Sequence, residues 1–350
     1  MASDLVVMAR TLVQAGKGIL AADETPRTIG KRFEALGIPS TAQTRRAYRE
    51  LLVTTPELQE VISGVILQDE TFRQTTSSGL PFARALIQRG MLPGIKVDTG
   101  AKPLANAPGE NVTEGLDGLR ERIAEYVGLG ARFAKWRALI SIANGTPTRA
   151  CLAANTHALA RYAALCQEGG LVPIVEPEVL MDGDHSIETC FAATITTWRA
   201  VFAELADQRV ALDAMVLKPS MILPGKQHSV QATVDEVGRR TVQGLRQTVP
   251  AAVPGIAFLS GGQSPELATR HMHAINALSP QPWQLSFSYG RALQDPALSA
   301  WKGEARNVGH AQAALLHRTR CVAAARDGAY NPAMESAYAD DSQRLSSVLV

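Results

Sequence analysis

Four charged side chains interrupt apolar runs in which charge is costly to bury. Lys218 closes the run DAMVLKPS and is followed by a proline; Lys96 and Lys135 lie inside LPGIKVD and RFAKWR. Glu176 lies inside LVPIVEPE. Such side chains are rarely buried without partners, so we expect the four segments to converge on one polar site. Burial lowers the pKa of an amine towards the range in which it acts as a nucleophile. The alternative is a set of separate structural ion pairs.

Further charged residues extend this pattern, because residues two apart on a strand share a face. Like charges near one another should lower the lysine pKa values, while the carboxylates can transfer protons. Asp23 ends another apolar run, GKGILAAD. The pairs that share a face are Lys96 with Asp98, Lys135 with Arg137, and Glu176 with Glu178.

Two glycine-containing segments and one loop could bind anions. FLSGGQS and FSYGRAL supply small residues whose backbone N–H groups can approach an anion, and Arg291 can form paired hydrogen bonds with a phosphate. SGG alone could be just a turn. Thr25, Thr28, Lys31 and Arg32 could hold a second anion. Thr25 could equally be a helix N-cap.

The elements that position these residues are eight short apolar runs, separated by segments long enough for helices. Continuous apolar runs are typical of parallel strands buried on both faces. The alternation predicts a (β/α)8 TIM barrel, in which chemistry is carried at the carboxyl ends of the strands. A doubly wound sheet is the alternative, but no GxGxxG follows the first run. The runs are 16–23, 61–69, 92–98, 132–138, 171–178, 213–220, 255–262 and 283–290.

The chain is expected to form a single domain. Helical periodicity predicts helices at 115–129, 154–169, 185–206, 230–247, 264–277 and 301–325, with a loop at 139–150. No low-complexity linker divides the sequence. We therefore predict a barrel domain over residues 1–327 and a mobile tail over 328–350, where the composition becomes small and polar.

Composition excludes several classes of protein. Of the 350 residues 46% are hydrophobic and 19% charged, which is typical of a globular protein. A net charge of +2 and 5% aromatic residues argue against a nucleic-acid partner. The N-terminus does not resemble a signal peptide, and no run approaches the roughly 18 apolar residues of a membrane helix.

The cysteine and histidine patterns bear on compartment and metal binding. The four cysteines are scattered without a CxxC motif, so a reduced cytoplasmic compartment fits best. His271 and His273 are two residues apart in a predicted helix and should point to different sides. We expect no metal site from these residues and no cofactor.

Together these features predict carbonyl chemistry. A lysine amine attacks a carbonyl carbon and forms an imine, which acts as an electron sink for cleaving or forming a C–C bond. With two anion sites beside it, the expected substrate is a phosphorylated ketose or aldehyde.

The motifs GILAADE, GIKVD, FAKWR, VPIVEPE, LKPSM, FLSGGQS and FSYGRAL, in this order, resemble class I, metal-independent fructose-bisphosphate aldolase. The resemblance extends from about Gly16 to Arg320. It implies reversible cleavage of fructose 1,6-bisphosphate to dihydroxyacetone phosphate and glyceraldehyde 3-phosphate, in glycolysis and gluconeogenesis. Members are commonly homotetramers.

The resemblance also implies residue roles. Lys218 matches the Schiff-base lysine and Glu176 the general acid/base that assists imine formation. Asp23 and Lys135 match residues that contact substrate hydroxyls, supported by Glu178 and Arg137. The C1-phosphate site corresponds to Ser260, Gly261, Gly262, Ser288, Gly290 and Arg291. The other phosphate corresponds to Thr28, Arg32 and Lys96, with Thr25 and Lys31.

The chain departs from the family pattern in three places. The first loop, ADETPRTIGKR, has threonines where many relatives have serines, and Lys96 is followed by VDTG without a second lysine. The chain ends in SVLV, whereas many relatives end in a tyrosine that reaches the active site. Tyr330 and Tyr338 lie upstream of that end. Two alternatives therefore stay open: a Schiff-base lyase for a ketose with a single phosphate, and a catalytically silent barrel that serves as a scaffold.

Overall fold

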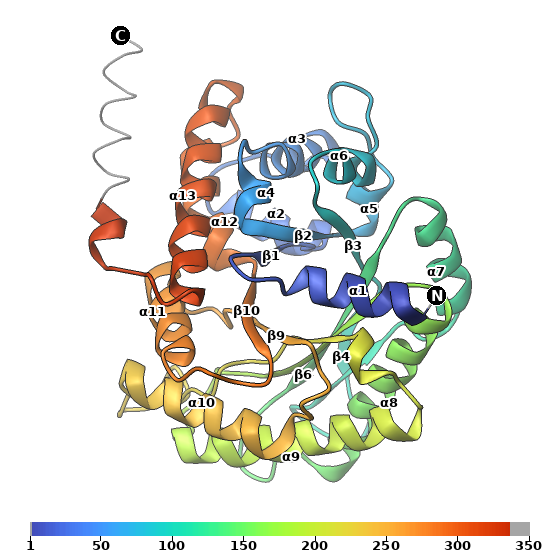
Figure 1. Ribbon diagram of the computed structural model, residues 1–350, viewed down its shortest axis with the longest axis vertical. Coiled ribbons are helices and arrows are strands. Elements are labelled where there is room, and N and C mark those ends of the chain that lie inside the picture. The colour runs from blue at the N-terminus through green and yellow to red at the C-terminus, as the bar shows by residue number, and fades with distance from the viewer. Residues whose placement is uncertain (1, 337–350) are drawn as a thin grey trace.

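Eight parallel strands close into a barrel surrounded by helices (Figure 1). The computed structural model describes residues 2–336. Around the barrel the strand order is β1-β2-β3-β6-β7-β8-β9-β10, with β10 beside β1. All eight predicted runs supply a strand, so the predicted (β/α)8 fold is confirmed. The barrel strands are β1 Gly18–Ala22, β2 Ile62–Leu67, β3 Leu92–Lys96, β6 Phe133–Ile140, β7 Val172–Val179, β8 Val216–Leu217, β9 Gly255–Phe258 and β10 Gln284–Tyr289.

Strand β8 is much shorter than the predicted run 213–220. Residues Leu212–Ala214 form a 3-10 turn before it. After β8, the backbone N–H of Lys218 still donates to the carbonyl of Val175 on β7, at 2.8 Å. Pro219 follows and has no N–H with which to continue the ladder. The strand therefore ends immediately before the lysine.

The helices predicted from periodicity are present within a few residues, except at the C-terminal end. There the helix predicted near 301–325 is present as α13, but it begins seven residues later, because α12 ends at Trp301 and α13 begins at Val308. Lys302 and Gly303 between them have φ angles of 53° and 77°, which break a right-handed helix. The helices are α1 Ala2–Leu12, α2 Pro26–Glu34, α3 Ala42–Val53, α4 Leu58–Val61, α5 Asp69–Phe72, α6 Phe82–Gln88, α7 Leu119–Gly128, α8 Arg149–Glu168, α9 Ile187–Asp207, α10 Val234–Thr248, α11 Pro265–Asn276, α12 Arg291–Trp301 and α13 Val308–Arg326.

Several elements were not predicted. Helices α1 to α6 all lie before residue 90, outside the ranges in which helical periodicity predicts a helix. An antiparallel hairpin of β4 (Gly100–Pro103) and β5 (Asn111–Glu114) separates β3 from α7. Four of the helices that follow strands, α8 to α11, begin at a Thr or Ser whose hydroxyl accepts a backbone N–H three residues on. Such caps satisfy the free N–H groups at a helix start.

The barrel interior is a packed apolar core, closed at one end by α1. Leu5 and Leu12 of α1 are buried in the same cluster as Ile66, Phe133 and Val172 of the barrel strands. Figure 1 shows α1 lying across the barrel. Because this end is closed, a ligand can reach the barrel only from the opposite end, where the strands finish.

Two glycines of the barrel strands make room for large aromatic rings. A Cβ on Gly94 would lie 2.2 Å from the ring of Phe133, and one on Gly18 would lie 2.3 Å from the ring of Phe287. Neither glycine tolerates a larger residue without moving an aromatic side chain.

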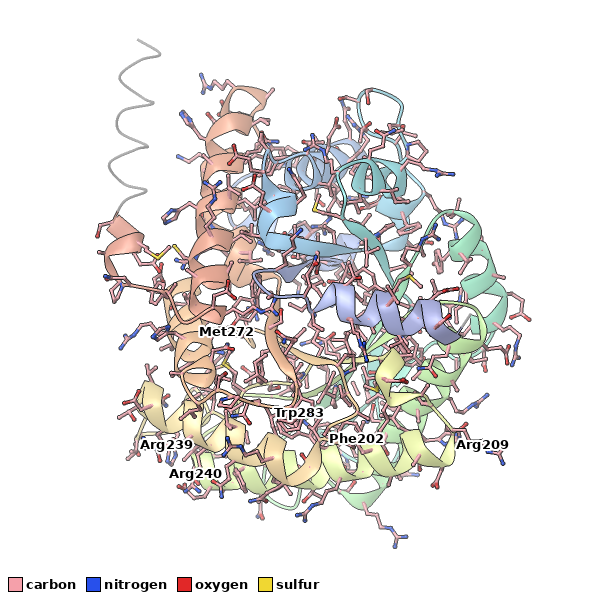
Figure 2. All side chains as sticks on the ribbon, in the orientation of Figure 1. Phe202, Arg209, Arg239, Arg240, Met272 and Trp283 are labelled. Carbon is pink, nitrogen blue, oxygen red and sulfur yellow. The ribbon has the colours of Figure 1, made fainter. Side chains whose placement is uncertain are left out.

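A second, larger apolar cluster lies between the barrel and the surrounding helices. Met272 and Trp283 are buried in it, whereas Arg239 of α10 and Arg209, in the turn after α9, are exposed (Figure 2). Within residues 2–336, no helix is both long and apolar enough to cross a membrane.

Residues 328–336, here called the C-terminal segment, pack against the barrel helices. Tyr330 is buried and its hydroxyl donates to Glu335 at 2.8 Å. Both carboxylate oxygens of Glu335 accept from the guanidinium of Arg318 on α13. The beginning of the predicted mobile tail is therefore held by an ion pair that its small, polar composition did not reveal. The rest of that tail, 337–350, lies outside the described residues.

Candidate active site

The charged side chains converge on one cavity of about 270 Å³ at the carboxyl ends of the strands. All but two of the residues predicted for the site line this cavity. The alternative, in which the charged side chains form separate structural ion pairs, is therefore wrong. The predicted residues that line it are Asp23, Thr25, Thr28, Arg32, Lys96, Lys135, Arg137, Glu176, Glu178, Lys218, Ser260, Gly261, Ser288, Gly290 and Arg291.

Glu176 joins two buried lysines at the centre of the cavity. One of its carboxylate oxygens lies 3.3 Å from Nζ of Lys218, and the other lies 3.2 Å from Nζ of Lys135. Asp23 contacts Lys135 from the opposite side at 2.8 Å. The side chains of both lysines and of Glu176 are at most 5% exposed, so these ion pairs are poorly screened by water. The network can hold or transfer protons at the point where Lys218 enters the cavity.

This network sets the protonation of its members. Burial alone would raise the pKa of Asp23, but Lys135 and Lys218 outweigh it and hold that pKa well below its usual value. For Glu176 burial again acts to raise the pKa, and the same two lysines lower it overall. Burial opposes the charged form of Lys135, but Asp23 and Glu176 raise its pKa above the usual value. The expectation that neighbouring amines would lower the lysine pKa values is therefore wrong for Lys135, because two carboxylates flank it.

A second set of contacts orients the cavity wall. Glu178 of β7 accepts from Nε of Arg137 of β6, although the strand register places Arg137 opposite Glu176. Asp98, buried after β3, forms an ion pair with Lys96 and accepts the backbone N–H of Arg137 at 3.3 Å. Lys96 also donates to the carbonyl of Asp98 at 2.7 Å. Arg137 and Lys96 are thus fixed by carboxylates beside them.

Backbone and side-chain donors gather after β9 and β10. Gly261 and Gly262 adopt φ angles of 59° and 87°, which turn the chain sharply after Ser260. A Cβ on Gly262 would lie 2.9 Å from Nη2 of Arg291, so Gly262 stands behind the arginine and does not itself line the cavity. Ser288 Oγ is buried and has no hydrogen-bond partner within residues 2–336. Gly290 precedes α12, whose first turn carries the positive end of the helix dipole. This side of the cavity suits an anion.

The opposite side is formed by the start of α2. Thr25 is the N-cap, accepting the N–H of Thr28, and both residues line the cavity. The two interpretations of Thr25 are therefore compatible. Arg32 forms ion pairs with Glu24 and, at 2.8 Å, with Asp295. Glu24 itself lines the cavity and also binds Arg49 at 2.9 Å, a role that sequence reasoning missed.

Lys31 does not lie in the cavity. It is exposed and lines a separate surface hollow with Arg27 and Glu34. Successive helix positions are separated by roughly 100°, so Lys31 points away from the face that carries Arg32. Its assignment to the phosphate region is corrected accordingly.

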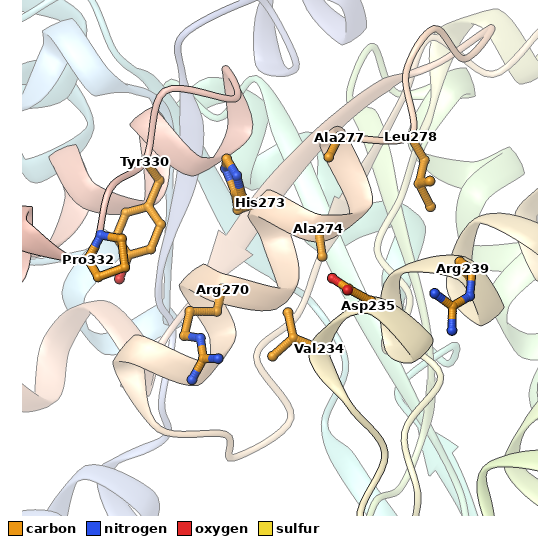
Figure 3. A pocket seen from close by; sticks show the side chains of 10 residues that line it. All are labelled: Val234, Asp235, Arg239, Arg270, His273, Ala274, Ala277, Leu278, Tyr330 and Pro332. Atoms are coloured by element: carbon orange, nitrogen blue, oxygen red, sulfur yellow. The ribbon is translucent and has the colours of Figure 1, made fainter.

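Another cavity, of about 400 Å³, lies between α10, α11 and the C-terminal segment (Figure 3). It is mostly apolar and contains none of the predicted site residues. Tyr330 lines this cavity beside His273, with their ring centroids 6.1 Å apart. Tyr330 is thus placed away from Lys218, and Tyr338 lies outside the described residues.

Comparison with known proteins decides the family. The family model of fructose-bisphosphate aldolase class-I matches residues 4–348. This chain belongs to that family. A probable fructose-bisphosphate aldolase class 1 of Xanthomonas campestris pv. campestris is 56% identical over 90% of this chain and 95% of its own length. Fructose-bisphosphate aldolase 4, cytosolic, of Arabidopsis thaliana is 48% identical over 93% of this chain and 84% of its own.

A solved structure supports the same assignment. The fructose-bisphosphate aldolase of Plasmodium falciparum, in complex with TRAP and a small molecule inhibitor, matches with a TM-score of 0.93 and 46% identity. The match covers 94% of this chain and 96% of that chain. The resemblance inferred from the motifs is confirmed: the chain is a class I aldolase-family enzyme that cleaves fructose 1,6-bisphosphate in glycolysis, by the Schiff-base chemistry general to class I.

Proposed function

We propose that Lys218 is the lysine that forms the Schiff base. Among the three lysines in the cavity, Lys135 is held between two carboxylates and Lys96 is bound by both the carboxylate and the carbonyl of Asp98. The amine of Lys218 contacts one carboxylate, that of Glu176, within residues 2–336. This difference carries the proposal, because an amine already held by two acceptors is poorly placed to attack a carbonyl carbon.

The proposed sequence begins when the ammonium of Lys218 passes a proton to the carboxylate of Glu176, 3.3 Å away, and the resulting neutral amine adds to the C2 carbonyl of fructose 1,6-bisphosphate. Glu176 supplies the proton that lets the C2 oxygen leave as water, and a protonated imine remains. When the C3–C4 bond breaks, its electron pair moves into this imine and forms an enamine. The C4 hydroxyl passes its proton to Glu176, which is a carboxylate again after the dehydration, and glyceraldehyde 3-phosphate leaves.

Protonation of the enamine at C3 and addition of water at C2 then complete the cycle. Dihydroxyacetone phosphate is released and the Lys218 amine is restored. The side chains of Lys218, Lys135 and Glu176 are at most 5% exposed, which limits the access of solvent to the intermediates.

The remaining residues are proposed to bind and orient the substrate. Asp23 and Lys135 would contact the substrate hydroxyls near the breaking bond, since both line the cavity beside Glu176. Glu178 and Arg137 would support their charge states. Ser260, Gly261, Ser288, Gly290 and Arg291 are proposed for the C1 phosphate, with Gly262 leaving room for Arg291 behind them. Thr25, Thr28, Arg32 and Lys96 are proposed for the other phosphate.

The difference in ion pairing between Arg291 and Arg32 favours this assignment of the two phosphates. Arg291 lines the cavity and has no ion pair within residues 2–336, so its charge is available to a phosphate. Arg32 is already paired with two carboxylates, and its side of the cavity relies more on the helix start at Thr25 and Thr28. Tyr330, which lines the other cavity, is not proposed as a proton carrier.

Location and assembly are part of the proposal. A cytoplasmic enzyme is supported by relatives whose names describe them as cytosolic. A homotetramer is proposed from the family resemblance, and light scattering coupled to size-exclusion chromatography tests it. A mass of one or two chains at assay concentration would contradict the tetramer.

Replacement of the proposed nucleophile tests the assignment. Lys218→Met should reduce kcat at least 10³-fold, with the circular dichroism spectrum unchanged. Lys102→Met, in the exposed hairpin strand β4, is the matched control and should keep full activity. Activity of the unaltered protein should persist in EDTA. Substantial turnover by Lys218→Met, or loss of activity in the chelator, would contradict the proposal.

A further inference from the structure

Three side chains that can bind metal ions gather away from the central cavity. His317 and Cys321 lie four residues apart on α13, which places them on the same face of the helix. Glu335 approaches them from the C-terminal segment. The ligand atoms of all three lie within 4.8 Å of one another, and none of the three lines the central cavity.

The distance between the two helix ligands fits a tetrahedral ion. Zn–S and Zn–N bonds of about 2.3 and 2.05 Å at a tetrahedral angle separate the sulfur and nitrogen by about 3.6 Å. In the structure Sγ of Cys321 lies 3.6 Å from Nε2 of His317. These two atoms would therefore need little rearrangement to share one ion.

The carboxylate is already oriented by other groups. Arg318 donates to both oxygens of Glu335, and Tyr330 donates to one of them at 2.8 Å. Metal-binding carboxylates are commonly held by such hydrogen bonds, and each oxygen keeps a lone pair for the ion. Cys321 is buried, while His317 and Glu335 are partly exposed, so an ion and its water ligand can enter from solvent.

We propose that His317, Cys321 and Glu335 bind a zinc ion that fixes the C-terminal segment to α13. Sulfur and imidazole ligands favour zinc over magnesium or calcium, which prefer oxygen ligands alone. Binding replaces the S–H bond of Cys321 by an S–Zn bond, and the thiol proton passes to solvent. Three protein ligands leave one position for water.

The consequence is a link between two parts of the chain. Two ligands belong to a barrel helix and the third to the segment from which residues 337–350 continue. Figure 3 shows Tyr330 and Pro332 of this segment beside α11, so the ion would hold the segment close to the cavity they line. The site is independent of the aldol chemistry, because its residues do not line the central cavity.

Cobalt, which replaces zinc in tetrahedral sites, tests the proposal in the full-length reduced protein. One equivalent of Co²⁺ should produce the visible bands of tetrahedral cobalt and a thiolate-to-cobalt band in the near ultraviolet, both removed by Zn²⁺. Cys321→Ser should lose the thiolate band. Cys190→Ser is the matched control, because Cys190 is also a buried helix cysteine but is followed four residues later by Thr194, at 3.8 Å. A wild-type protein without a thiolate band, or a Cys321→Ser protein that keeps it, would overturn the proposal.

A second variant covers the case in which Cys321→Ser fails to fold. His317→Gln alters a partly exposed residue and should weaken Co²⁺ binding at least tenfold. Zinc should slow hydrogen exchange of residues 328–336 in the wild-type protein and leave it unchanged in His317→Gln. Unchanged cobalt affinity in His317→Gln would overturn the site. So would inhibition of aldol cleavage by one equivalent of zinc, because that would place the ion in the central cavity.

Discussion

Replacing Glu176 by glutamine removes the central carboxylate of the cavity, and with it both proton transfer and ion pairing, while keeping a side chain of nearly the same size. Its carboxylate lies within 3.3 Å of the amines of Lys218 and Lys135. At that distance and an effective dielectric constant of about 20, each pair attracts by about 5 kcal/mol before desolvation is subtracted. Removing one partner of a buried pair has a net cost of about 3–5 kcal/mol, so Glu176→Gln should be measurably less stable to denaturant.

The catalytic effect should exceed a simple loss of stability. A positioned general acid/base contributes about 10² to 10⁴-fold, which corresponds to about 3–5 kcal/mol of transition-state stabilisation. We therefore expect kcat for fructose 1,6-bisphosphate to fall by at least 10²-fold at a temperature where the variant is fully folded. KM should change much less, because Glu176 is not proposed to bind a phosphate.

Glu178→Gln is the matched control. Glu178 is a similarly buried glutamate two residues along β7. It forms its ion pair with Arg137 and not with Lys218 or Lys135. It should lose less than tenfold in kcat. Coupled assays for both triose phosphates, with rapid-quench measurement of imine formation, follow the two variants. A Glu176→Gln enzyme within threefold of wild-type kcat, or equal losses in both variants, would refute the role given to Glu176.

Four further outcomes follow from the contacts of the cavity. Arg291→Ala should raise KM for fructose 1,6-bisphosphate by about 10- to 100-fold, since charged hydrogen bonds contribute about 1.5–3 kcal/mol; an unchanged KM would contradict its phosphate role. Gly262→Ala and Gly261→Ala should both strain the backbone, because both residues have positive φ, but only the Cβ at 262 would lie 2.9 Å from Arg291, so Gly262→Ala should raise KM more; equal KM values for the two variants would argue against this geometry. Fructose 1-phosphate should be cleaved with a much higher KM than the bisphosphate, and equal efficiency would rule out the second phosphate site. Because the pKa of Asp23 is lower in the folded protein than its value of 3.8 in the unfolded chain, the ionised carboxylate stabilises the fold above that pH. This stabilisation is lost as the pH falls from 3.8 through the lower pKa of the folded state, so Asp23→Asn should show a shallower decline of Tm in acid. Parallel declines of Tm in the variant and the wild type would contradict the pairing with Lys135.

The barrel and most of its site could be predicted because each depends on a local pattern. Strands buried on both faces read as continuous apolar runs, and a charged residue within such a run is conspicuous. Lys218, Lys135 and Glu176 were found in this way, and the fold then brought their strand ends together. The family motifs added the phosphate-binding segments, whose glycines have no apolar pattern of their own.

Other features depend on contacts between distant parts of the chain. Arg32 pairs with Asp295, 263 residues later, and no spacing rule indicates that its charge is already balanced. Lys31 was placed wrongly because a short stretch of sequence does not fix which face of α2 meets the cavity. The C-terminal segment looks like a mobile tail in composition, yet Arg318 and Glu335 hold it to α13. Such ion pairs become visible only when the elements are placed in space.

The central claim is that the amine of Lys218 forms the imine. Incubation with dihydroxyacetone phosphate and borohydride should reduce that imine to a stable secondary amine, which adds the mass of the triose phosphate less one oxygen atom to one peptide. Peptide mass mapping should find the adduct on the peptide containing Lys218 and none on those containing Lys96 or Lys135. An adduct on either of the other lysines, or no adduct in an active enzyme, would contradict the account.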